Sequence, residues 1–256
     1  MKDGMLRAKT SILIALMAVV LIAVVAGASL QYQERALREN LLAGLEAVAA
    51  TSSVSIESFV RDGRYSASLI AAAVPRQPLV DGRNLVQIER ALKQSVAQAP
   101  RFRNGLFILD ADGRFLVDYP THPELHGDSF AYRDYYQRAV AERGPVISRP
   151  YISKRTGKPV ITFATPITAA DGKILAVLGC SVDLLAEDAL GPVPKQRIGK
   201  TGYIYAMDTT REMILHPDES RVLTRDVPPG ATACSTPRSR AFRASAKRST
   251  RAASPC

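Results

Sequence analysis

The chain has 256 residues, of which 46% are hydrophobic and 23% charged, a balance typical of globular proteins and not of disordered chains or multi-span transporters. Its net charge of +10 is gathered at the ends: residues 231–256 hold six basic residues and no acidic one, so the body of the chain is nearly neutral. This distribution argues against a nucleic-acid partner. The three cysteines lie too far apart for a zinc or redox motif, and we expect neither a metal nor a cofactor.

The amino-terminal segment contains an uncharged run of 19 residues, from Ile12 to Leu30. At about 1.5 Å of rise per residue, a helix of this length spans roughly 28 Å, close to the hydrocarbon core of a bilayer. The leader, residues 1–10, is basic and should stay in the cytoplasm. We therefore predict a single-pass helix over residues 11–30 in the inner (cell) membrane, with the rest of the chain periplasmic or extracellular. A cleaved signal peptide is the alternative, because Ala26-Gly27-Ala28 resembles a cleavage site, and it exports the same residues.

Two helices are predicted in the next segment, residues 31–100. Apolar residues recur at helical spacing from Leu37 to Phe59, and no Gly-Pro break separates them from the uncharged run. We expect one long amphipathic helix that extends to about Ala73 and forms a homodimer with a second copy. Another helix is predicted from Asn84 to Gln98, with Pro100 ending it.

After Pro100 the hydrophobic period changes from 3.6 toward 2, which predicts a small α+β module over residues 101–190. Two apolar runs separated by the turn Asp110-Ala111-Asp112-Gly113 predict a hairpin. A helix and three antiparallel strands should follow, an order found in PAS-like sensor folds. These elements are expected at Tyr132–Ala141, Val146–Ser153, Val160–Ile167 and Ile174–Val182.

An internal repeat predicts a second module that begins within residues 191–230. The segments Leu106–Pro120 and Ile204–Pro217 share an apolar run, an aspartate, a short polar turn and a second apolar run. Residues 231–256 contain no aliphatic residue larger than alanine, so we predict a disordered basic tail and an incomplete second module. A disturbed reading frame and a genuine basic tail both remain open as its origin.

Together these features resemble the double-Cache sensor regions of bacterial transmembrane receptors, most specifically at Tyr132–Leu184 and Gly199–Pro217. The resemblance implies a long helix that carries a membrane-distal and then a membrane-proximal Cache module. In the family a second span and a chemoreceptor, histidine kinase or diguanylate cyclase output follow, and this chain shows neither. We expect a membrane-anchored sensor that binds a small carboxylate or amino-acid-like ligand without its output domain. A secreted or tethered periplasmic binding or scaffold protein is the alternative.

A candidate ligand site lies at the start of the predicted helix, in Arg133-Asp134-Tyr135-Tyr136. A guanidinium flanked by aromatic rings suits a small carboxylate, because its planar fork donates two charge-assisted hydrogen bonds. Alternatively, Arg133 is a surface residue paired with Asp128 or Asp134, and the tyrosines only pack the helix on the sheet.

The resemblance extends this site to other segments. In amino-acid-binding members an Arg-x-Trp-Tyr run and a strand tyrosine hold the ligand carboxylate, and a strand aspartate holds the amine. Ser181 stands where that aspartate is expected, which favours a carboxylate or other small anion over an α-amino acid. Asp183 lies two residues later and is alternatively a cap that closes the strand. The candidate ligand-binding residues are Arg133, Tyr135 (at the Trp position), Tyr136, Tyr151 (the strand tyrosine), Ser181, Asp183 and Asp128 (where a further tyrosine is usual).

Motifs that carry catalysis are missing from the sequence. There is no G-x-S-x-G elbow, P-loop or G-x-G-x-x-G. The segment His122-Pro123-Glu124-Leu125-His126 is not a zinc-protease motif, because its glutamate does not directly follow the first histidine and Pro123 makes the segment a loop. We therefore expect a binding protein and not an enzyme.

Overall fold

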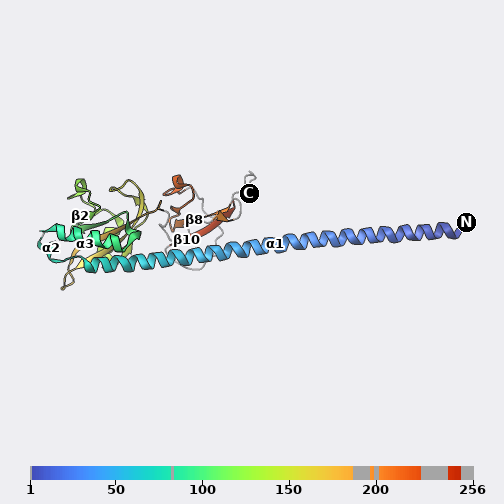
Figure 1. Ribbon diagram of the computed structural model, residues 1–256, viewed down its shortest axis with the longest axis horizontal. Helices are drawn as coiled ribbons and strands as arrows, with labels where there is room; N and C mark the ends of the chain where they lie inside the picture. Colours follow the sequence, from blue (N-terminus) through green and yellow to red (C-terminus); the bar gives the residue numbers. More distant parts are fainter. Residues whose placement is uncertain (1, 82–83, 187–196, 199–201, 226–241, 249–256) are drawn as a thin grey trace. The chain divides into compact units, whose positions relative to one another are not determined.

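The computed structural model describes the backbone of residues 2–81, 84–186, 197–198, 202–225 and 242–248 (Figure 1). Side chains are described from residue 16 onward within these ranges, except at residues 18, 81, 197–198, 202 and 242–248. The chain divides into two units, Met1–Val48 and Ala49–Cys256.

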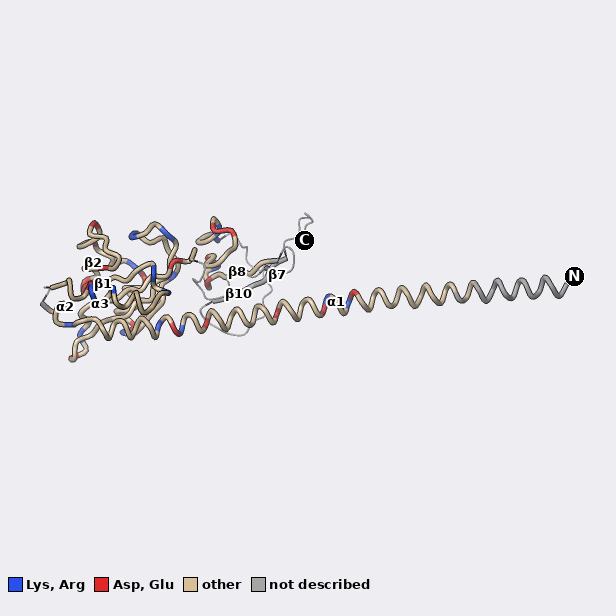
Figure 2. Tube along the Cα trace, in the orientation of Figure 1, with Lys and Arg blue, Asp and Glu red and all other residues tan. Residues whose placement is uncertain are grey.

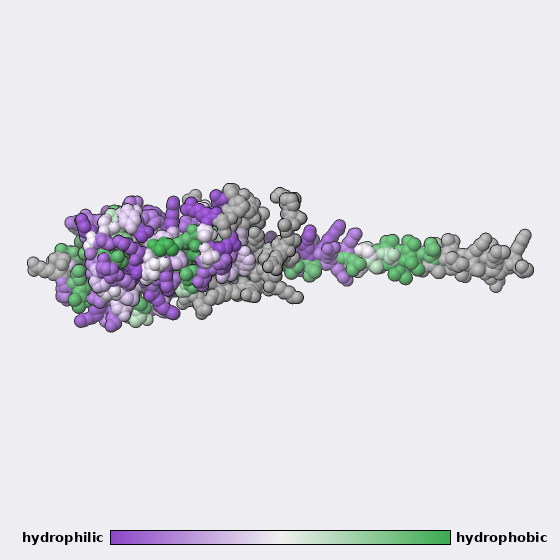
Figure 3. Space-filling view, turned by 90° about the horizontal axis from the view of Figure 1, so that it is seen from above, coloured by the Kyte–Doolittle hydropathy of each residue, from purple (hydrophilic) through white to green (hydrophobic). Residues whose placement is uncertain are grey.

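Helix α1, Lys2–Ala73, is 72 residues long and ends where the sequence predicts. It stops just before Val74-Pro75, because a proline disfavours helical geometry in the residue before it. The apolar side chains between Leu16 and Leu30 are exposed along α1 (Figure 3), and this stretch carries no charge before Glu34 (Figure 2). No helix among the described residues is long and apolar enough to cross a membrane. The predicted span 11–30 lies partly outside them, because side chains 1–15 and 18 are not described.

Three short helical segments follow α1. They are α2 (Gln77–Asp81), α3 (Leu85–Gln98) and the 3-10 turn η1 (Pro100–Phe102). Helix α3 begins one residue after the predicted start and buries Ile88 and Leu92, which belong to the predicted apolar face. The described residues therefore confirm both helices that were predicted between residues 31 and 100.

The first sheet has the strand order β2-β1-β6-β5-β3, and β4 also pairs with β5. All of its pairs are antiparallel, as predicted. Its strands are β1 (Leu106–Asp110), β2 (Phe115–Tyr119), β3 (Val146–Ile147), β4 (Tyr151–Ile152), β5 (Pro159–Thr168) and β6 (Ile174–Asp183). Between β2 and β3 lie η2 (Pro123–Leu125) and α4 (Asp134–Glu142).

One predicted strand, Val146–Ser153, forms two short strands in the structure. Pro150 lies between β3 and β4 and has no backbone N–H to donate to the ladder. Both pieces still pair with β5. Tyr151, one of the predicted ligand-binding residues, is therefore the first residue of β4.

The two faces of this sheet are covered by different elements. On one face the ring of Phe163 packs against Phe59 of α1 and Phe102 of η1, with ring centroids 5.9 and 5.8 Å apart. On the other face Phe107 joins a buried cluster that includes Tyr135 of α4. Since side chains alternate along a strand, helix α1 and the predicted ligand site lie on opposite faces.

The second sheet has the order β10-β8-β7, and β9 also pairs with β8. Its elements are β7 (Arg197–Ile198), β8 (Gly202–Asp208), β9 (Met213–Leu215), the 3-10 turn η3 (Glu219–Arg221) and β10 (Phe242–Arg248). Strands β8 and β9 form the hairpin that the internal repeat predicts within residues 204–217.

The repeated hairpins share the hydrogen bonds of their turns. Asp110 Oδ1 accepts from the backbone N–H groups two and four residues later, at 2.9 and 2.8 Å. Asp208 Oδ1 does the same, at 2.8 and 2.9 Å. Each turn also has a residue with positive φ at the third position after the aspartate, Gly113 at 78° and Arg211 at 66°. The internal repeat is therefore a repeat of turn geometry as well as of sequence.

The predicted disordered tail, residues 231–256, contains a strand, which corrects this part of the sequence analysis. Strand β10 pairs antiparallel with β8 along seven residue pairs, from Phe242↔Asp208 to Arg248↔Gly202. The edge of β8 offers backbone donors and acceptors, and pairing with them does not require large aliphatic side chains. Residues 231–241 and 249–256 lie outside the described residues.

Candidate functional site

Arg133 lies at the amino-terminal cap of α4 with an extended backbone, φ −73° and ψ 136°. Its guanidinium carbon is 5.1 Å from the centre of the Tyr132 ring and 4.7 Å from that of Tyr151. Its Nε is buried and has no hydrogen-bond partner in the part of the chain that is described. The guanidinium is therefore flanked by aromatic rings, as predicted, although one of the two rings belongs to Tyr132.

Tyr135 is buried, and its ring contacts two other aromatic rings. Its ring stacks on Tyr151 at 5.7 Å and meets Phe107 edge-on at 6.0 Å. Burial raises the pKa of the Tyr135 hydroxyl well above its ordinary value, and burial also raises the pKa of Tyr151. Both phenols therefore remain protonated near neutral pH and can donate hydrogen bonds.

A chain of three hydroxyl groups crosses the sheet from Tyr151 to Ser181. The Tyr151 hydroxyl is 2.7 Å from Thr162 Oγ1, which is 3.1 Å from Ser181 Oγ. Thr162 and Ser181 face each other in the β5-β6 ladder, and both are buried. We call Arg133, Tyr135, Tyr151, Thr162 and Ser181 the Arg133 site. The sequence analysis missed Thr162, which is one of three threonines in β5 and so does not stand out in the sequence.

The other three candidates are engaged in different contacts. The Tyr136 hydroxyl donates to the Ala111 carbonyl at 2.6 Å, which ties α4 to the β1-β2 turn. Asp128 forms an exposed ion pair with Lys154 at 2.6 Å. Asp183 forms an ion pair with Lys158 at 2.7 Å, and it accepts the Leu185 backbone N–H at 2.9 Å, which closes the end of β6.

The alternative pairing of Arg133 with an aspartate is not seen among the described contacts. Asp134 accepts the backbone N–H of Arg149 at 3.0 Å, and Asp128 pairs with Lys154. Arg133 thus keeps a buried donor that no described carboxylate satisfies.

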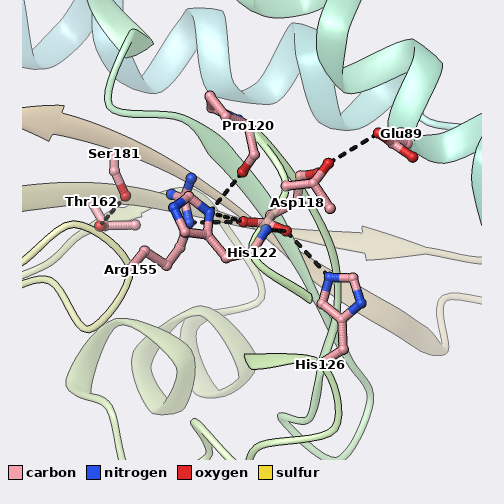
Figure 4. A network of polar contacts seen from close by, with 9 residues as sticks. Glu89, Asp118, Pro120, His122, His126, Arg155, Thr162 and Ser181 are labelled. Carbon is pink, nitrogen blue, oxygen red and sulfur yellow. Dashed lines mark hydrogen bonds and ion pairs between the residues drawn. The ribbon is translucent and has the colours of Figure 1, made fainter. Parts of the chain in front are cut away.

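A second charged group, the buried network around Asp118, was not singled out from the sequence (Figure 4). Asp118 Oδ2 is 3.1 Å from Arg155 Nε and 2.8 Å from His122 Nδ1. Its Oδ1 is 3.3 Å from His126 Nε2 and accepts the His122 backbone N–H at 3.0 Å. Burial lowers the pKa of Arg155, and Asp118 partly offsets this effect. His122 and His126 lie only four and eight residues after Asp118, whereas Arg155 lies 37 residues after it. A local pattern could have indicated the two histidines, but not Arg155.

The Arg133 site contains chemical groups of the kind that can bind an anion. A guanidinium offers several N–H donors in a plane, the rings provide apolar walls, and the hydroxyl chain can both donate and accept. No group of three or more His, Cys, Asp or Glu residues in the described ranges is arranged to hold a metal ion.

Comparison with known proteins places these features in a wider context. The family model described as "Cache domain" matches residues 33–247. The methyl-accepting chemotaxis protein McpA of Bacillus subtilis is 30% identical over 115 residues, which cover 44% of this chain and 16% of the relative. The methyl-accepting chemotaxis protein PscA of Pseudomonas syringae is 23% identical over 191 residues, 75% of this chain and 29% of the relative.

Among solved structures, the ligand-binding domain of the Pseudomonas fluorescens chemoreceptor CtaA in complex with L-serine aligns with a TM-score of 0.58. The two are 19% identical, and the alignment covers 73% of this chain and 76% of that domain. At this identity the likeness shows the fold alone. The chain spans less than a third of the length of the curated relatives it matches.

Proposed function

The chain belongs to the Cache domain family, and we propose on that basis that it is the extracytoplasmic sensor region of a bacterial signalling receptor. Its ligand would be a small molecule with a carboxylate, bound at the Arg133 site. The role is one of binding, and the site residues carry out no chemical step.

The observation that carries this proposal is the state of Arg133. Its guanidinium is held between the rings of Tyr132 and Tyr151, and its buried Nε has no partner among the described residues. A buried donor of a charged group costs free energy unless something accepts its hydrogen bond. A ligand carboxylate can accept from the guanidinium fork while its carbon chain lies against the Tyr135 and Tyr151 rings.

Ligand binding can be tested on the whole chain, purified with detergent, by thermal shift in the presence of small carboxylates and amino acids. A ligand at 100 times its dissociation constant adds about 2.7 kcal/mol to the free energy of unfolding. We expect Arg133→Ala to abolish the shift. Arg149→Ala, at a nearby exposed arginine, is the matched control and should keep it. A shift that survives Arg133→Ala would contradict the assignment of the site.

The second part of the proposal is a membrane anchor. The charge-free run from Ile12 to Leu30 follows a basic leader, which supports a single-pass helix with the Cache region outside the cytoplasm. The alternative is a secreted binding or scaffold protein, favoured by the small residues Ala26-Gly27-Ala28. The intact mass of the exported protein separates the two: loss of residues 1–28 supports secretion, and a full-length product in the membrane fraction supports the anchor.

The third part is a homodimer formed along α1. The exposed side chains of Leu37, Leu41 and Leu42 on this helix support it, because they gain burial against a second copy. Cross-linking through single cysteines introduced at exposed positions of α1 tests the contact. Dimers that cross-link at helical spacing are expected, and a monomer in detergent at all concentrations would contradict it.

A further inference from the structure

Arg155 carries two unsatisfied donors in the interior of the protein. Its side chain is only 3% exposed, and its Nε contacts Asp118 at 3.1 Å. Its Nη1 and Nη2 are buried and have no hydrogen-bond partner within the described residues. Buried polar groups in proteins are almost always hydrogen-bonded, so the two nitrogens indicate a missing acceptor.

Asp118 does not supply that acceptor. Its two carboxylate oxygens already interact with Arg155 Nε, two histidine rings and the His122 backbone N–H. Figure 4 shows these groups converging on the one carboxylate. The guanidinium therefore meets its only described acidic partner through one edge, and its two terminal nitrogens are left for another anion.

The free nitrogens lie on the same side of the sheet as the Arg133 site. The Arg155 guanidinium carbon is 5.7 Å from the Phe107 ring, which in turn contacts Tyr135 at 6.0 Å. Its Nη2 lies over Gly105, whose carbonyl accepts the backbone N–H of Ser181 at 3.0 Å. Burial raises the pKa of Tyr151, and the positive charges of both Arg133 and Arg155 partly offset that effect. The rings of Tyr151, Tyr135 and Phe107 contact one another in a row, which we call the aromatic wall. The Arg133 guanidinium lies against Tyr151 in this wall, and the Arg155 guanidinium lies against Phe107.

Acidic side chains near this wall are already paired. Asp183 is held by Lys158 and Asp128 by Lys154, at 2.7 and 2.6 Å. Of the two arginines, Arg155 is paired with the buried carboxylate of Asp118, and Arg133 has no described carboxylate partner. This leaves an excess of positive charge, which favours a ligand that brings more than one negative charge.

We propose that Arg155 is a second anion-binding position of the Arg133 site, and that the ligand is a short-chain compound with two acidic groups, a dicarboxylate. One carboxylate binds Arg133, and the other accepts hydrogen bonds from Nη1 and Nη2 of Arg155. The inference rests on the proposed ligand-binding function and adds the class of ligand.

The test uses two ligand pairs in which a methyl group replaces one carboxylate: succinate against butyrate, and aspartate against 2-aminobutyrate. Binding to the full chain in detergent is measured by calorimetry. We expect the diacid of at least one pair to bind about 10- to 100-fold more tightly, the range that a hydrogen bond to a charged group contributes. This comparison uses the wild-type protein and so does not depend on how a variant folds.

The double variant Asp118→Asn/Arg155→Gln removes both charges together and avoids leaving a buried carboxylate unpaired. It should bind the monoacid as the wild type does and lose the preference for the diacid. A diacid preference that persists in this variant would overturn the role of Arg155. Equal binding of both members of each pair, dependent on Arg133, would overturn the inference and leave the proposed function standing. No binding of any of the four compounds, or of other small carboxylates, would overturn both.

Discussion

Thr162 and Phe163 are neighbours on β5, and their side chains lie on opposite faces of the sheet. Thr162 Oγ1 lies 2.7 Å from the Tyr151 hydroxyl in the Arg133 site. The Phe163 ring packs 5.9 Å from Phe59, on the long helix α1. Because these two residues are adjacent in β5, the strand directly connects the candidate ligand site to the contact with helix α1. A ligand that shifts β5 would move both contacts together.

The contact between α1 and the sheet depends on Gly63. A Cβ atom at this position would overlap the Phe163 ring, with Cε1 at 2.6 Å. In an exposed helix the change from glycine to alanine stabilises by roughly 0.5–1 kcal/mol. At Gly63 we expect the opposite sign, a loss of about 1–3 kcal/mol in the free energy of unfolding, because the core is overpacked. Urea denaturation measures it.

Two further variants define this effect. Gly44→Ala lies on the same helix with nothing within 4 Å of the added Cβ, and it should not lower stability. Gly63→Ala combined with Phe163→Leu should recover part of the loss, since leucine vacates the space of the ring. A Gly63→Ala protein as stable as the wild type would contradict the packing described for this contact.

A second glycine, Gly105, supports the charged part of the site. Its φ is +107°, and a Cβ would lie 2.7 Å from the Tyr119 carbonyl and in contact with Arg155. We expect Gly105→Ala to lower the free energy of unfolding by about 2 kcal/mol or more, because backbone strain of roughly 1–3 kcal/mol adds to the steric overlap. Thermal and urea unfolding measure the loss.

The control for Gly105→Ala is Gly127→Ala. Gly127 also has a positive φ, +89°, but nothing lies within 4 Å of the added Cβ. It therefore carries the backbone strain without the overlap and should lose less stability. Similar losses at the two positions would show that the contact with Arg155 and Tyr119 contributes nothing.

The elements of the first module were predictable because each has a local signal. The mainly apolar runs of β5 and β6 indicated their positions, and the turn at Asp110 indicated the first hairpin. The split between β3 and β4 was missed, although Pro150 marked it in the sequence. Strand β10 was missed because backbone pairing with β8 leaves no hydrophobic pattern.

The candidate site was predictable only in part. Arg133 could be named from the Arg-Asp-Tyr-Tyr run and Tyr151 from the family resemblance. In the structure the Arg133 guanidinium carbon lies 4.7 Å from the centre of the Tyr151 ring. Thr162 and Arg155 join the site through the register of β5 and the ion pair with Asp118, which are long-range relationships. No pattern within one segment records such contacts.

The buried phenol of Tyr135 predicts a pH dependence. Burial raises its pKa in the folded state above the unfolded value of about 10, so the folded protein holds this proton more tightly. The resulting stabilisation is complete below pH 10 and is lost as the pH rises through the folded-state value. We expect the free energy of unfolding to fall above pH 10, and to fall less steeply in Tyr135→Phe.

This pH effect is measured by urea denaturation between pH 8.5 and pH 11. Tyr132→Phe is the control, because Tyr132 is 61% exposed, and its profile should follow that of the wild type. Parallel profiles for all three proteins would contradict a buried, protonated Tyr135.

Cys180 offers a probe of how often the sheet opens. It is fully buried on β6, and burial raises the pKa of its thiol, so the reactive thiolate is scarce in the folded state. In a protein with Cys234→Ser and Cys256→Ser, we expect no labelling by a thiol reagent at pH 8 over minutes, and complete labelling in denaturant. The residual rate then reports the fraction of molecules in which β6 is exposed. A ligand that binds only the folded protein at 100 times its dissociation constant should slow this rate about 100-fold. Rapid labelling of the native protein would show that Cys180 is accessible and would contradict its place in the sheet.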